Sequence, residues 1–308
     1  MIRYTLRQLE YFVAVGETGS IARASERINV SSPSISAAIA QLEKEFGVPL
    51  FMRQHAQGLV LTEGGRLMLD QARHVLREAG ALMDIAGDIS GSVRGPLRVG
   101  CLVSFVQLVL PKLRRAFETA YPEVRFRQFE MNQANLLSAL RRSEIDVALT
   151  YDMELPADLV FTPLSELSPI ALLGAQHPLA GRETVSIEAL KDHPMVLLDL
   201  PISADYFLSL FDERPVIAER TSDMAVMRSM VGNGFGYSIV NMRPPSDIAP
   251  DGTRVLSVPI AGPVRSLRMG LLTSRQGERS NAVRAFSRCA SEMVPGRLAT
   301  GAGGAPPA

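Results

Sequence analysis

A cluster of hydroxyl groups stands near the N-terminus, where four serines surround one proline and one isoleucine over residues 31–36. Hydroxyl groups donate and accept hydrogen bonds, so they can hold phosphates or contact either kind of base edge, and a proline ring can contact the methyl group of thymine. The alternative is that the first or second serine caps a helix, a role compatible with the others. The sequence therefore predicts a small, hydrogen-bonding surface made by Ser31, Ser32, Pro33, Ser34 and Ser36.

Two short helices joined by a polar turn are expected to position these hydroxyl groups. Residues 20–28 carry apolar side chains at near-helical spacing, and Ile35, Ile39 and Leu42 continue that pattern in a second helix. Asn29–Ser31 supplies the short connection that a helix-turn-helix needs. Because the first residues of a recognition helix contact base edges, the serines lie where DNA would be read.

A supporting helix and a hairpin are expected on either side of this pair. The segment TLRQLEYFVAVGETG has apolar residues at helical spacing and precedes it, while two short apolar runs at 49–53 and 58–62 follow it. Arg53, in the first run, supplies a positive charge that can hold a phosphate or reach the minor groove. Residues 1–61 are therefore predicted to form a winged helix-turn-helix domain.

The charge of the chain does not by itself favour nucleic acid. The 32 Lys and Arg residues balance 32 Asp and Glu residues, and residues 1–90 hold nine basic against ten acidic side chains, a net charge of −1. A general polyanion binder carries a basic excess. DNA contacts are therefore expected to come from locally placed arginines and from helix N-termini.

Several other classes of protein are disfavoured by composition. The first ten residues lack the apolar core of a signal peptide, and no run of about 18 apolar residues is long enough to span a membrane. The cysteines Cys101 and Cys289 are too few for a disulfide framework, which predicts a reduced, cytoplasmic protein; a thiol switch is the alternative to ordinary buried cysteines. The four histidines show no metal-ligand spacing and nothing places a catalytic triad, so neither a metal site nor an enzyme is expected.

A long helix is predicted over residues 62–90, with apolar residues every three or four positions from Leu69 to Ala86. A solitary helix with such a stripe would be unstable, so we expect it to pair with a second copy; packing onto its own chain is the alternative. Residues 91–96 break the helix as a hinge. A tail over 296–308, rich in Gly, Ala and Pro, is expected to be disordered.

Residues 91–295 alternate strand and helix patterns, which predicts an α/β domain with a largely parallel sheet. Two subdomains are expected, one from about 95–165 with 267–295 and the other from about 166–266.

Parallel sheets bind ligands just beyond the carboxyl ends of their strands. The residues at those ends are Val103, Ser104, Asn132, Gln133, Tyr151, Asp152, Asp199 and Ser203. Ser104, Asn132 and Ser203 stand where helices begin, which favours a carboxylate, while Asp152 and Asp199 add negative charge. An amino acid or a related zwitterion is the predicted ligand. Ordinary helix caps and aspartate-bound turns are the alternative.

Taken together, these features resemble the LysR-type transcriptional regulators over essentially the whole chain apart from the tail. The resemblance rests on LRQLEYFVAVGETGSIARASERINVSSPSISAAIAQLEKEFGVPLF and LTEGG, and then on VLPKLRRAFETAYPEV, SEIDVALTYD and GNGFGYSIV. It implies a winged helix-turn-helix, a dimerising linker helix and an effector domain like the periplasmic solute-binding proteins. It also implies dimers or tetramers that bend promoter DNA, respond to a small molecule and can contact RNA polymerase, without catalysis.

Two other functions compete with this interpretation. A solute-binding protein for transport would need an export signal and no DNA-binding head, and this sequence shows the reverse. An enzyme would need a convergent nucleophile or metal set, which the sequence does not display.

Overall fold

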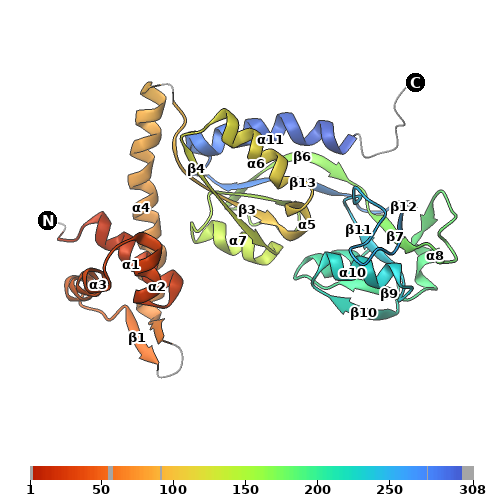
Figure 1. The fold of residues 1–308 in the computed structure, drawn as a ribbon, viewed down its shortest axis with the longest axis horizontal. Helices are drawn as coiled ribbons and strands as arrows, with labels where there is room; N and C mark the ends of the chain where they lie inside the picture. Colours follow the sequence, from red (N-terminus) through yellow and green to blue (C-terminus); the bar gives the residue numbers. More distant parts are fainter. Residues whose placement is uncertain (1–2, 55–57, 91, 276, 300–308) are drawn as a thin grey trace. The chain divides into compact units, whose positions relative to one another are not determined.

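The computed structural model describes residues 3–54, 58–90, 92–275 and 277–299 (Figure 1). By its internal contacts the chain divides into two units, each of which is described by itself. The first consists of Met1–Ser92 together with Arg142–Glu144, and the second of Val93–Arg141 together with Ile145–Ala308. Among the described residues, no helix has the length and hydropathy that crossing a membrane requires.

The first unit begins with three helices, each of which starts and ends at a capping residue. They are α1 (Leu6–Thr18), α2 (Ile21–Ile28) and α3 (Ser32–Phe46). Thr5 and Gln8 form a capping box at the start of α1, and α2 ends at Asn29 in the left-handed conformation, with φ of 53°. The three helices share one core, in which Phe12, Ile35 and Leu42 are fully buried. The helix-turn-helix predicted from the sequence is confirmed.

A two-stranded hairpin and a long helix complete this unit. Strands β1 (Phe51–Gln54) and β2 (Gly58–Leu61) pair antiparallel, and α4 (Glu63–Ser90) follows. The hydroxyl of Thr62 accepts the N–H of Gly65 at 2.8 Å and so caps α4. Gly65 is required for packing, because a Cβ atom there would lie 2.1 Å from the carbonyl oxygen of Leu50. The hairpin is thereby held against the start of the long helix.

The second unit contains two lobes. The first lobe is built on a five-stranded sheet in the order β4-β3-β5-β13-β6. Its strands are β3 (Gly95–Leu102), β4 (Val124–Met131), β5 (Val147–Tyr151), β6 (Leu159–Leu167) and β13 (Leu267–Ser274). Strand β3 runs parallel to β4 and β5, whereas β13 runs antiparallel to β5 and β6. Four of these strands therefore run in one direction, in agreement with the largely parallel sheet predicted from the sequence, and β13 opposes them because the chain returns through it from the other lobe.

Helices cover both faces of this sheet (Figure 1). They are α5 (Val103–Val106), α6 (Leu110–Ala120), α7 (Gln133–Arg141) and α11 (Asn281–Ala299). On one face α6 packs against α11, where the rings of Phe117 and Phe286 lie 5.4 Å apart. On the other face lies α7, which a right-handed return from β4 to β5 requires.

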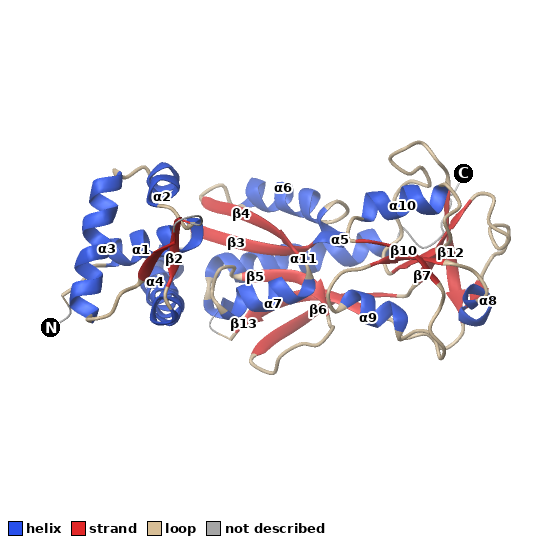
Figure 2. Cartoon of the chain, turned by 90° about the horizontal axis from the view of Figure 1, so that it is seen from below, coloured by secondary structure: helices blue, strands red, loops and turns tan. Residues whose placement is uncertain are grey.

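The second lobe also combines strands and helices (Figure 2). Its strands are β7 (Ile170–Gly174), β8 (Val185–Ser186), β9 (Met195–Leu198), β10 (Ile217–Thr221), β11 (Ser238–Val240) and β12 (Val255–Ala261). Its helices are α8 (Ile187–Lys191), α9 (Ser203–Leu208) and α10 (Met224–Gly232). One sheet has the order β11-β7-β12-β8, and the parallel pair β10-β9 joins it through a bridge between Met195 and Tyr237.

Two crossover segments connect the lobes, one between β6 and β7 and one between β12 and β13. They lie side by side, because the hydroxyl oxygens of Ser168 on the first and Ser266 on the second are 3.1 Å apart. Any change in the angle between the lobes must be accommodated at these two segments.

The structure differs from the sequence prediction at the C-terminus. The closing helix α11 runs to Ala299 and so includes the first four residues of the predicted tail, which begins at Gly296. Arg297, Leu298 and Ala299 are good helix formers, which accounts for the extension. The rest of the predicted tail lies outside the described residues.

Candidate functional site

The N-terminal end of α3 presents the predicted hydroxyl cluster. The hydroxyl of Ser31 accepts the N–H of Ser34 at 3.4 Å, and the hydroxyl oxygens of these two residues are 2.8 Å apart. Ser31, Ser34 and Ser36 are exposed, as is Pro33, and Ser32 is half-buried. Ser31 therefore acts as a helix cap while its side chain stays at the surface, so the two roles predicted for it are compatible.

The rest of the exposed face of α3 is small and polar. Ala37 and Ala40 are exposed on it, and Gln41 and Lys44 extend it toward the end of the helix. Gln41 and Lys44 were not predicted from the sequence as site residues, although both fall off the apolar stripe of that helix. A narrow helix face of this kind fits the major groove of DNA, which admits an α-helix.

Arg53 lies in β1 opposite Leu59. Its side chain lies outside what the structure describes, so its assignment as a phosphate contact stays a prediction.

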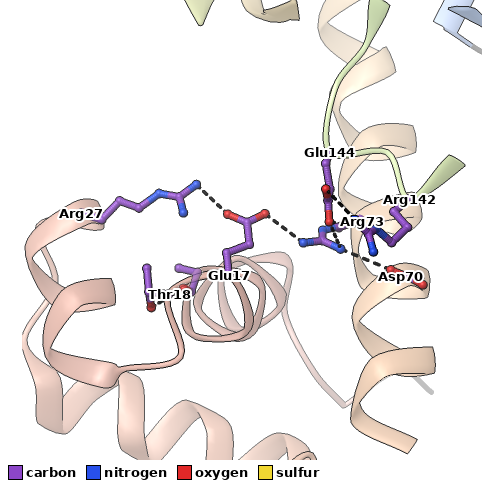
Figure 3. Close-up of polar contacts among 8 residues, drawn as sticks. Glu17, Thr18, Arg27, Asp70, Arg73, Arg142 and Glu144 are labelled. Carbon is purple, nitrogen blue, oxygen red and sulfur yellow. Dashed lines mark hydrogen bonds and ion pairs between the residues drawn. The ribbon is translucent and has the colours of Figure 1, made fainter. Parts of the chain in front are cut away.

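A buried guanidinium ties the helices of this unit together (Figure 3). The side chain of Arg73 on α4 is 6% exposed and lies 3.2 Å from carboxylates of both Glu17 on α1 and Asp70. Glu144, which belongs to the same unit, lies 3.0 Å away, and Glu17 also pairs with Arg27 on α2 at 2.6 Å. These ion pairs join α1 and α2 to the long helix α4. Removing Arg73 would be costly, because the carboxylates around it would lose their positive partner.

The second unit contains a cavity of about 230 Å³. It lies where β5, β9 and β11 end and α5 begins, so the carboxyl ends of strands from both lobes meet at this cavity. Its walls are mostly apolar. They include Leu108, Met153, Leu198, Phe207, Met224, Val240 and Leu267.

Four of the predicted effector residues line this cavity, namely Val103, Ser104, Tyr151 and Ser203. The hydroxyl of Ser104 hydrogen-bonds to Tyr151, and burial raises the pKa of the Tyr151 phenol, so that phenol stays protonated. Ser203 begins α9. Their contact with a ligand stays a prediction.

Asn132 and Gln133 are not among the described lining residues of the cavity. Asn132 accepts the N–H of Asn135 at 2.9 Å and so caps α7, which is the alternative that the sequence left open. Gln133 is fully buried, and its amide donates to the carbonyl oxygens of Tyr151 at 3.2 Å and Met153 at 3.0 Å. Its side chain therefore holds the end of β5 instead of facing the ligand space.

Asp152 and Asp199 also lie outside the set of described lining residues. Asp152 pairs with Arg268 at 2.7 Å, and Asp199 pairs with Arg220 at 3.1 Å. Each carboxylate is compensated by an arginine, and no described lining residue is acidic. The structure therefore gives the amine of the predicted zwitterion no carboxylate partner in this cavity.

Arg228 on α10 is the charged side chain among the described lining residues. Its Nη2 donates to the carbonyl oxygens of Ser246 at 2.6 Å and Ile248 at 2.9 Å, whereas its buried Nε has no partner in the described part of the chain. Burial lowers the pKa of this guanidinium, against an opposing effect of Asp247. A partly desolvated cation beside a cavity favours an anionic ligand.

Asn241 and Tyr206 form a hydrogen-bonded pair on the cavity wall. The Nδ2 of Asn241 donates to the Tyr206 hydroxyl oxygen at 2.8 Å, and that hydroxyl donates to the carbonyl oxygen of Arg265 at 2.7 Å. Neither residue was predicted from the sequence as a site residue. A signal existed for Asn241, because it directly follows β11 just as the predicted residues follow their strands.

The two cysteines are unbridged. Burial raises the pKa of the Cys101 thiol, with a smaller effect of Glu130, and burial likewise raises that of Cys289. A thiol that resists deprotonation is a poor nucleophile, which disfavours the switch. The described residues include no group of three or more His, Cys, Asp or Glu side chains placed to hold a metal ion.

Two family models match the chain. Residues 6–66 match the bacterial regulatory helix-turn-helix protein of the lysR family, and residues 90–295 match the LysR substrate binding domain. The first range contains α3 and the hairpin, and the second contains the cavity.

Individual proteins agree with these matches. The HTH-type transcriptional regulator BudR of Raoultella terrigena is 30% identical over 247 residues, which cover 76% of this chain and 83% of BudR. The crystal structure of HinK, a LysR family transcriptional regulator from Pseudomonas aeruginosa, is 34% identical with a TM-score of 0.63, covering 94% of this chain and 99% of HinK. Full-length CbnR complexed with its target DNA shares the fold, at a TM-score of 0.64 and 23% identity, covering 94% and 99%.

Proposed function

Because this chain belongs to the LysR family of transcriptional regulators, we propose that it binds promoter DNA through α3 and the hairpin, under control of a ligand in the cavity. The exposed hydroxyl cluster at the start of α3 carries the proposal. The proposed DNA contacts are Ser31, Ser32, Pro33, Ser34, Ser36 and Arg53. Hydroxyl and backbone N–H groups supply hydrogen bonds there, while the arginine supplies charge.

The regulator acts as a homo-oligomer whose copies meet along α4. Leu82, Ile85 and Ile89 on that helix are exposed, at 68%, 56% and 84%, and a second copy of the helix would remove them from water. Pairing of two copies also raises the affinity for DNA, because two linked DNA-binding domains bind two half-sites together. A single DNA-binding domain without an excess of basic residues lacks that affinity. RNA polymerase is a further partner of the DNA-bound oligomer, and the cytoplasm is its compartment.

The ligand is a small carboxylate held in the cavity against Arg228, with Val103, Ser104, Tyr151 and Ser203 around it. A carboxylate compensates the guanidinium that burial disfavours. Its binding changes the angle between the two lobes of the effector domain, and so changes how the oligomer holds or bends DNA.

Electrophoretic titration of the full-length protein on the DNA upstream of its own gene tests the DNA-binding role. The expected result is a discrete complex that is displaced by that fragment and not by an unrelated fragment of equal length. Equal displacement by both fragments would remove the proposal.

A further inference from the structure

The orientation of the Asn241 side-chain amide is fixed by its neighbours. Its Nδ2 lies 3.3 Å from the carbonyl oxygen of Leu167 and 2.8 Å from the hydroxyl oxygen of Tyr206. A carbonyl can only accept, and the Tyr206 hydroxyl has already given its hydrogen to the carbonyl of Arg265. Both neighbours therefore require donors, so the nitrogen must face them and the oxygen must face away.

The Oδ1 atom of Asn241 is a buried acceptor in need of a donor. Asn241 is 3% exposed and lines the cavity, and its Oδ1 has no hydrogen-bond partner among the residues that the structure describes. Buried polar atoms are nearly always satisfied, because leaving one without a partner costs its full desolvation. A donor group on the ligand would satisfy this oxygen.

The remaining lining residues decide what kind of donor that is. An ammonium group would be buried without compensation, since none of the described lining residues is acidic, and that is far more costly than burying a hydroxyl group. Arg228 favours an anionic group, and most of the other described lining residues are apolar. The cavity thus fits an apolar body that carries one carboxylate and one hydroxyl group.

The same pair of residues contacts both crossover segments. Leu167 ends β6, at the first crossover, and Arg265 precedes β13, at the second. Asn241 bonds to the first carbonyl directly and to the second through Tyr206. A ligand bound to Oδ1 would therefore act on the two places where the lobes are joined.

We propose that the effector is a small apolar hydroxy-carboxylate whose hydroxyl group donates to Oδ1 of Asn241, and that the Asn241–Tyr206 pair transmits its binding to both crossovers. This inference rests on the ligand control proposed above and names the ligand class and the coupling residues.

Calorimetry on the full-length protein tests the ligand class with two matched pairs, 3-hydroxybenzoate against benzoate and 3-hydroxybutyrate against butyrate. In at least one pair the hydroxy acid should bind roughly 5- to 30-fold more tightly. Asn241→Leu should reduce that preference to about threefold or less. Equal affinities within both pairs, binding by none of the four acids, or a preference that survives in Asn241→Leu would each overturn the proposal.

Hydrogen exchange tests the coupling, and it does not depend on Asn241→Leu folding. At saturating hydroxy acid, wild-type protein should gain protection at residues 165–169 and 262–267. Tyr206→Phe should lose the gain at 262–267. Tyr237→Phe is the matched control, because it removes a buried hydroxyl from the same lobe that has no partner among the described residues, and it should keep the gain. Protection that persists in Tyr206→Phe would overturn the coupling.

The same preparations separate this inference from the proposed function. Wild-type protein that selects its promoter fragment but shows no hydroxyl preference would sink the inference and leave the DNA-binding role intact. Protein that prefers the hydroxy acid but does not select its promoter fragment would refute the DNA-binding role and leave the ligand inference intact.

Discussion

The guanidinium of Arg73 on α4 lies 3.2 Å from the carboxylate of Glu17 on α1. This pair joins the helix that carries the proposed oligomer contact to the first helix of the DNA-binding head. Since Glu17 also pairs with Arg27 on α2, one carboxylate links three helices.

Arg73→Met should destabilise the protein by about 2–3 kcal/mol, somewhat below the cost of breaking a fully buried pair, because Glu17 and Asp70 are partly exposed. Urea denaturation followed by circular dichroism measures the change. Arg27→Met is the control, and it should cost at most about 1 kcal/mol because that side chain is 41% exposed. Equal losses in the two variants would contradict a special role for Arg73.

The adjacent glycines at the start of α4 should respond in opposite ways to alanine. Gly65→Ala should cost about 1–3 kcal/mol, because its Cβ would press on the carbonyl oxygen of Leu50 at 2.1 Å. Gly64→Ala should stabilise the protein by about 0.5–1 kcal/mol, because its Cβ would meet nothing closer than 3.9 Å and alanine favours the helix. Thermal melts of both variants measure these changes. An unchanged melting temperature in Gly65→Ala would contradict the close packing of Gly65 against Leu50.

Protonation of His177 should lower the stability of the folded protein as the pH drops below about 6.5, the ordinary pKa of histidine. Burial lowers the pKa of His177 in the folded protein, and the ring of His193 at 4.6 Å adds to this. The unfolded chain therefore binds the proton first, so this contribution is fully present above 6.5 and is lost as the pH falls through the folded pKa. Melting temperatures from pH 8 to pH 5 should fall less steeply for His177→Gln than for wild type. His74→Gln serves as the control, and parallel profiles for His177→Gln and wild type would refute the assignment.

Ser36→Ala should weaken promoter binding by about two- to tenfold without changing thermal stability, because the Ser36 hydroxyl is exposed. Ser31→Ala should in addition lose about 1 kcal/mol of stability, since its side chain caps α3. Fluorescence anisotropy with labelled promoter DNA, together with melts, separates the two effects. Full promoter affinity in Ser36→Ala would show that this hydroxyl is not a DNA contact.

The sequence was sufficient for the parts of the fold that are coded locally. The helix-turn-helix follows from apolar spacing and from cap residues such as Ser31 and Asn29, each within a few positions of the helix it delimits. A proline within a strand weakens the alternating pattern by which strands are predicted, as Pro163 does in β6 and Pro259 does in β12. Pro163 is tolerated because β6 is an edge strand with an irregular register beside it.

The candidate cavity could be predicted only in part, because its chemistry depends on long-range pairs. Asp152 follows a strand and carries a charge, so its sequence context favours a ligand contact. Its partner Arg268 lies 116 residues further along the chain, and no local pattern announces that pairing. The Tyr206–Asn241 pair cannot be read from a local pattern either, because its members are 35 positions apart in the chain.

Recognition of a particular promoter sequence by this protein can be measured by electrophoretic titration at physiological salt. We expect a dissociation constant of about 10⁻⁸ to 10⁻¹¹ M for the DNA upstream of its own gene, at least about 1,000-fold tighter than for an unrelated fragment. Equal affinity for the two fragments, falling together as salt is raised, would mean that the protein binds phosphates without sequence preference, and would refute promoter recognition.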